Sequence, residues 1–77
     1  MKVYVDNLHR KTTEAQLRKL FEGFGKVASV LIVRERPGSP SCRYGFIEMK
    51  EASEARTAIA ALNGSLLGSL VLTVVEA

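Results

Sequence analysis

Hydrophobic and polar residues follow two different periodicities along this chain, and the two kinds of segment are interleaved. Four segments either alternate between apolar and polar positions or are rich in β-branched residues, which predicts strands at residues 2–8, 27–34, 44–49 and 70–76. Two other segments carry apolar side chains at i, i+3, i+4 and i+7, which predicts helices at residues 13–24 and 52–62. The predicted order is therefore βαββαβ.

The ends of the first helix have their own signals. Thr13 with Gln16 three residues later is typical of a capping box, so the helix is expected to begin there. Gly23 and Gly25 stand at its other end, where a residue in the left-handed conformation usually stops a helix. An irregularity near Ala28 is expected in the second strand, because Val27 and Val30 both suit the core.

Two helices with one apolar stripe each can cover only one face of a four-stranded sheet. The predicted fold is therefore α+β and ferredoxin-like, with both helices on one face of an antiparallel sheet ordered 4-1-3-2. Residues 1–77 are expected to form a single domain, because a chain of 77 residues buries only one small core.

The other face of this sheet is predicted to carry aromatic rings. Strand alternation places Tyr4, Tyr44 and Phe46 away from the helices, so three of the five aromatic residues lie outside the core. Apolar clusters on the surface of a small protein usually mark a binding site.

Composition excludes several classes of protein without identifying one. The net charge of +3 permits a polyanionic partner but does not require it. The single cysteine, Cys42, allows no internal disulfide and no cysteine-rich metal site, and no cofactor is expected. No apolar run is long enough to span a membrane and no secretory signal is apparent. We expect an intracellular protein, cytoplasmic or, in a eukaryote, nuclear.

Two segments resemble the signature motifs of the RNA recognition motif (RRM) family. Residues 3–8 (VYVDNL) are similar to the six-residue motif of its first strand. Residues 42–49 (CRYGFIEM) are similar to the eight-residue motif of its third strand, K/R-G-F/Y-G/A-F-V-x-F/Y. Residues 17–27 and 55–64 resemble its two helices, so the resemblance covers nearly all of the chain. The start at Met1, directly on the first strand, is similar to small single-domain bacterial members.

This resemblance implies binding of single-stranded RNA. Tyr4, Tyr44 and Phe46 match the family's base-stacking positions, and a ring offered to solvent stacks on an unpaired base for about 1–3 kcal/mol. Single-stranded DNA is a variant of this prediction, because stacking does not distinguish the sugars. Further candidates for RNA contact are Lys2, Asn7, Arg34, Arg36, Arg43, Thr73 and Val75.

The eight-residue motif departs from the family pattern at its start. Cys42 replaces a Lys or Arg and Arg43 replaces a glycine, so one phosphate contact is lost and weaker binding is expected. Met49 replaces an aromatic residue at the last position of the motif. This position is expected to face the core, so packing alone explains the methionine.

Two other functions, catalysis and protein–protein interaction, are alternatives to RNA binding. Catalysis is not expected, because His9-Arg10-Lys11 lacks the glycines of a phosphate-binding loop and no catalytic pair is evident. A protein–protein interaction module is the stronger alternative: Leu31, Val33 and Val75 make the open face unusually apolar, suited to a protein partner or to self-association.

Overall fold

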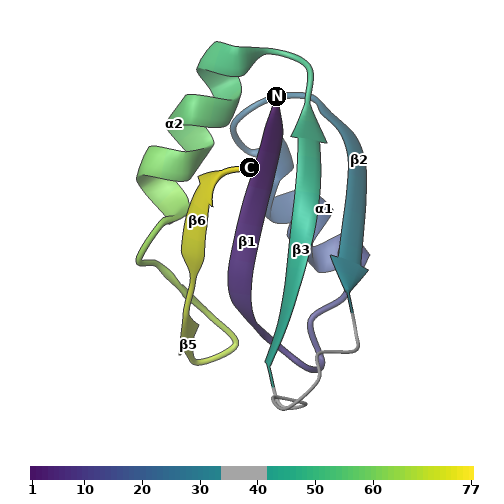
Figure 1. Ribbon diagram of the computed structural model, residues 1–77, viewed down its shortest axis with the longest axis vertical. Coiled ribbons are helices and arrows are strands. Elements are labelled where there is room, and N and C mark those ends of the chain that lie inside the picture. Colours follow the sequence, from purple (N-terminus) through teal and green to yellow (C-terminus); the bar gives the residue numbers. More distant parts are fainter. Residues whose placement is uncertain (34–41) are drawn as a thin grey trace.

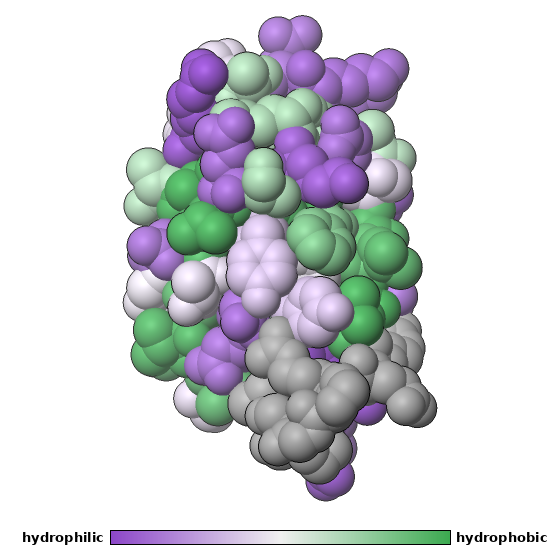
Figure 2. All heavy atoms as spheres, viewed as in Figure 1, coloured by the Kyte–Doolittle hydropathy of each residue, from purple (hydrophilic) through white to green (hydrophobic). Residues whose placement is uncertain are grey.

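The computed structural model describes residues 1–33 and 42–77. Its helices and strands are β1 (Lys2–His9), α1 (Glu14–Glu22), β2 (Val27–Val33), β3 (Cys42–Met49), α2 (Ala52–Leu62), β4 (Leu66–Leu67), β5 (Leu70–Val71) and β6 (Thr73–Glu76). The main sheet has the order β2-β3-β1-β6, and every pairing in it is antiparallel. Since β6 is the fourth predicted strand, the predicted fold and the order 4-1-3-2 are confirmed. Helix α1 lies behind the sheet in Figure 1, and the opposite face of the sheet is turned to the viewer in Figure 1 and Figure 2.

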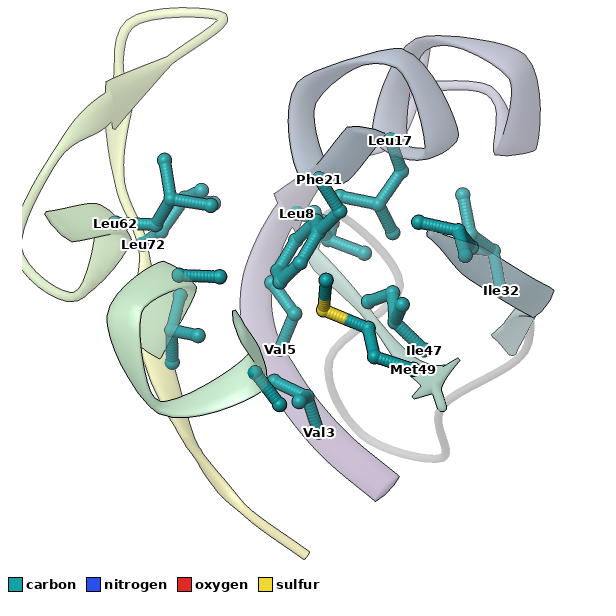
Figure 3. Close-up of a cluster of buried hydrophobic side chains, with 14 residues drawn as sticks. Val3, Val5, Leu8, Leu17, Phe21, Ile32, Ile47, Met49, Leu62 and Leu72 are labelled. Carbon is teal, nitrogen blue, oxygen red and sulfur yellow. The ribbon is translucent and has the colours of Figure 1, made fainter. Parts of the chain in front are cut away.

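The core lies between the sheet and the two helices. Alternate residues of the strands are fully buried on this side, among them Val3, Val5, Ile47, Met49 and Val74. They meet the apolar stripes of the helices, where Leu17, Phe21, Ala55 and Ala58 are also fully buried (Figure 3). Met49 therefore faces the core, as its place in the strand alternation predicts.

Helix α1 begins as predicted but ends differently. The Thr13 hydroxyl accepts from the backbone N–H of Gln16 at 3.2 Å, and the Gln16 side chain accepts from the Thr13 N–H at 2.9 Å, which completes the capping box. Gly23 ends the helix in the right-handed conformation (φ −63°), so the predicted left-handed stop is wrong. Gly25 has a packing role instead, because a Cβ there would collide with the Glu54 side chain of α2.

Two irregularities in the strands keep apolar residues on the core side. The pairing of β2 with β3 shifts between Val27 and Ser29, which confirms the irregularity expected near Ala28. The pairing of β1 with β3 shifts between Val5 and Leu8, where Asn7 adopts a positive φ of 66°. Such a bulge adds one residue to a strand, and both Val5 and Leu8 are consequently buried.

The predicted last strand, residues 70–76, is divided in the structure. Leu70–Val71 pairs with Leu66–Leu67 in a separate hairpin, and only Thr73–Glu76 joins the main sheet. The turn between the two short strands has positive φ at both central residues, Gly68 (59°) and Ser69 (71°), as a type I′ turn requires. This hairpin was absent from the sequence prediction, although Leu72 and Val74 point into the core as expected.

Candidate nucleic-acid interface

Side chains on the open face lie in rows that cross the four strands of the main sheet. Phe46 of β3 is opposite Leu31 of β2 on one side and Tyr4 of β1 on the other, and Tyr4 is in turn opposite Val75 of β6. These four residues form an apolar row across the whole sheet. Leu31 and Val75 at its two ends are 58% and 42% exposed. Figure 2 shows rings in the middle of this face with apolar surface beside them.

Three aromatic rings lie together at the centre of the open face, as the strand alternation predicts. The centroid of the Tyr4 ring is 5.9 Å from that of Tyr44 and 5.6 Å from that of Phe46, and the Tyr44 and Phe46 centroids are 6.1 Å apart. The Tyr44 and Phe46 rings meet edge to face with an angle of 86° between their planes, the Tyr4 ring is tilted by 44° and 53° to them, and all three residues are partly buried. We call Tyr4, Tyr44 and Phe46 the aromatic platform.

Asp6 fixes one side of the aromatic platform. Its carboxylate accepts from the Tyr4 hydroxyl at 2.8 Å and from the backbone N–H of Asn7 at 2.7 Å. The first bond orients the Tyr4 ring, and the second braces the bulge of β1. A carboxylate beside the platform also repels phosphate, which makes this side of the face unfavourable for a nucleic-acid backbone.

A row of polar side chains lies next to the apolar row, two residues away from it along each strand. Glu48 of β3 is opposite Ser29 of β2 and Lys2 of β1. The Lys2 ammonium group lies 5.6 Å from the centroid of the Phe46 ring, within the range of a cation–π contact. Glu48 Oε1 is 3.6 Å from the amino group of Met1. The predicted contact residues include Lys2 but not Ser29 or Glu48, which strand pairing brings into the same row.

The other predicted contact residues have different surroundings. Thr73 and Val75 are exposed on β6, opposite Asp6 and Tyr4, so they extend the open face. Asn7 donates from its side-chain amide to the Val71 carbonyl at 2.7 Å, which gives it a structural role between β1 and the small hairpin. Arg43 is partly buried at the end of β3 where it pairs with Leu8.

Three predicted features lie wholly or partly outside the described residues. Arg34 and Arg36 belong to the segment 34–41, and the side chain of Cys42 is likewise not described. Within the described part of the chain, neither helix is long and apolar enough to cross a lipid bilayer. Nor do three metal-binding side chains come together among residues 1–33 and 42–77.

Comparison with known proteins identifies relatives of this chain in sequence and in structure. A sequence model of the RNA recognition motif matches residues 3–73. Protein elav of Drosophila melanogaster is 45% identical over 73 residues, which is 94% of this chain but only 15% of that protein. The solved structure of RNA Binding Protein PG1 is 34% identical with a TM-score of 0.89, covering 100% of this chain and 93% of that one. The structure of the Rna15 RRM with bound RNA (GU) is 27% identical with a TM-score of 0.84, covering 99% and 81%.

Proposed function

This chain belongs to the RNA recognition motif family, and on that premise we propose that it binds short single-stranded RNA across the open face of its sheet. The observation that carries the proposal is the aromatic platform. Its three rings lie within 5.6–6.1 Å of one another on the face of the sheet opposite the helices. Because these rings already contact one another, their side chains need little rearrangement when a base stacks on them.

The platform favours an unpaired strand. Bases offer their flat faces only where they are not stacked in a duplex, so a sheet of exposed rings suits single strands and loops. The Rna15 RRM, which shares this fold at a TM-score of 0.84, was solved with bound RNA. These relatives support RNA as the partner over the protein–protein alternative.

Electrostatics suggests that stacking supplies most of the binding free energy. The face carries one lysine, Lys2, beside the rings, while Asp6 and Glu48 bring negative charge. The described part of this face can then neutralise few phosphates, so its contribution to the salt dependence of binding is expected to be small. We propose a binding module without catalytic activity, because the platform offers a surface for bases rather than a reactive group.

The tyrosines of this chain provide a direct test. The sequence holds two tyrosines and no tryptophan, and both tyrosines belong to the platform. Intrinsic fluorescence excited in the tyrosine band therefore reports on this face alone. Titration with a short single-stranded RNA should quench it saturably, because a stacked base quenches the ring beneath it.

The control is the same RNA annealed to its complement, which should leave the fluorescence nearly unchanged. A folded protein whose tyrosine fluorescence ignores the single strand would contradict the proposal. A parallel titration with single-stranded DNA of the same sequence tests whether the sugar matters.

A further inference from the structure

A hollow of about 320 Å³ opens at one side of the aromatic platform. Its lining comes from three adjacent strands of the main sheet, β2, β3 and β1: Lys2, Ser29, Leu31, Phe46 and Glu48. The apolar row contributes Phe46 and Leu31, and the polar row contributes the other three. The hollow therefore has an apolar part suited to the face of a base and a polar part suited to its edge.

Strand geometry sets how a base would lie there. Phe46 and Glu48 are two residues apart on β3, so their side chains point to the same face about 7 Å apart along the strand. A base stacked on Phe46 and resting against Leu31 turns an edge toward the polar row. Glu48 and Lys2, which are opposite each other, are the charged groups on that row.

The two charges impose a pattern of donors and acceptors on that edge. An ionised carboxylate only accepts hydrogen bonds, and an ammonium group only donates them. Guanine presents two adjacent donors, N1–H and the N2 amino group, followed by the O6 acceptor. Adenine and cytosine present one amino donor beside acceptors, and uracil flanks its single N–H with two carbonyl oxygens that the carboxylate would repel. Only guanine can donate twice to one carboxylate, the strong bidentate arrangement.

We propose that this hollow is a guanine-selective subsite, in which Phe46 stacks on the base, Glu48 accepts from N1–H and the N2 amino group, and Lys2 donates to O6. The inference rests on the proposed function, because it names the base preferred at one position of the same RNA-binding face. It adds Glu48, which the family motif leaves open, as a specificity-determining residue.

Two existing contacts must be compatible with this arrangement. The Met1 amino group is 3.6 Å from Oε1 of Glu48, whose side chain is 42% exposed. Because a carboxylate has about four lone-pair positions, Glu48 can still accept hydrogen bonds from a base. The Lys2 ammonium group lies over the Phe46 ring at 5.6 Å and must leave when a base arrives. Base stacking is stronger than an exposed cation–π contact, and the flexible lysine stem lets the ammonium group move to the edge of the base.

The test measures binding of labelled pentanucleotides by fluorescence anisotropy. The probes are UUUUU and four variants with guanine, inosine, adenine or cytosine at the centre. The unmodified protein should bind the guanine probe about tenfold more tightly than UUUUU, as one bidentate contact allows. Inosine lacks only the N2 amino group, so it should lose several-fold of this preference. Glu48→Gln should reduce the guanine-to-uracil ratio to within about twofold, because the amide replaces one of the two accepting oxygens with an NH2 donor that faces a donor of guanine.

Glu76→Gln is the matched control, since it removes the same charge from an exposed position on β6 and should keep the preference. Equal affinity for all five probes, or a guanine preference that survives Glu48→Gln, would overturn the guanine subsite while leaving RNA binding intact. Failure of the folded protein to bind any probe would instead refute the proposed function, and the subsite with it.

Discussion

The same strands present two faces of different character. On the side of the helices, Val3, Val5, Ile47 and Met49 are completely buried among aliphatic neighbours and the Phe21 ring. On the other side, the neighbours of these residues in sequence form the aromatic platform, whose rings contact one another and remain partly exposed. Outside the two bulges, each strand thus alternates between a buried position that stabilises the domain and a position on the open face.

This difference means that stability and binding should be separable by mutation. A substitution on the core face should act on the free energy of unfolding, and one on the open face should act on affinity. Ile47 and Phe46 are adjacent in sequence, yet they should fall on opposite sides of this division.

The largest effect is expected on the core face. Phe21→Ala removes a fully buried ring between α1 and the sheet, and should lower the free energy of unfolding by about 3–5 kcal/mol. A domain of this size has only a few kcal/mol of stability, so the variant should be largely unfolded at room temperature. Urea titration followed by circular dichroism measures this. A variant as stable as the parent would show that Phe21 does not support the core.

Gly45 lies between Tyr44 and Phe46 in sequence, but it belongs to the core face of β3. A Cβ there would lie 2.6 Å from the backbone carbonyl oxygen of Leu31, which cannot move without disturbing β2. Gly45→Ala should therefore cost about 1–3 kcal/mol of stability in the same urea titration. Gly23→Ala is the control, because its φ is −63° and its nearest neighbouring atom would be 3.5 Å away. Equal stability of the two variants would refute the close approach at Gly45.

Charge on the open face should be visible in the salt dependence of RNA binding. On UUUUU, which offers no guanine to the proposed subsite, Lys2→Met should make the slope of log K against log salt shallower by about 0.7, the value for one phosphate contact on a single strand. Anisotropy titrations at several salt concentrations measure this slope. Cys42→Lys, which restores the basic residue of the family motif, should steepen the slope by a similar amount. Slopes that are unchanged in both variants would show that neither position lies near a phosphate.

The smallest effect is expected from Tyr4→Phe. This change keeps the ring but removes the hydroxyl that donates to Asp6 at 2.8 Å. Stability should fall by about 1 kcal/mol or less, and affinity for RNA should stay close to that of the parent, because stacking needs only the ring. A large loss of affinity in a stable variant would mean that the hydroxyl itself contacts RNA.

The sequence predicted most of the fold because its periodicities agree with its tertiary structure. The capping box at Thr13, the irregularity near Ala28 and the face of every platform ring follow from local patterns. The small hairpin was missed although Leu66-Leu67-Gly68-Ser69-Leu70-Val71 holds apolar pairs around a two-residue Gly-Ser turn, a known hairpin signal. The end of α1 was misjudged because Gly25 is required by contact with Glu54, which is 29 residues away in sequence and invisible to local rules.

The site was predicted less completely than the fold. Alternation identified the three rings, but the polar row depends on which residues are opposite one another across β2, β3 and β1. Alternation gives the face on which each residue lies but not its partner on the next strand, so the pairing of Glu48 with Lys2 and Ser29 could not be predicted from spacing alone. For Asn7 the motif allows a base contact or a role in the turn, and its hydrogen bond to the Val71 carbonyl fits the second role, while base contact stays a prediction.

The central claim is that the aromatic platform binds RNA without stabilising the fold to a comparable degree. The most direct measurement is the affinity of the Phe46→Ala variant for a labelled single-stranded RNA, by anisotropy, beside its urea unfolding curve. We expect binding to weaken by about 1–3 kcal/mol. The loss of stability should be smaller than that of Phe21→Ala, because the Phe46 ring is only partly buried. A folded Phe46→Ala protein that binds RNA as tightly as the parent would contradict the account.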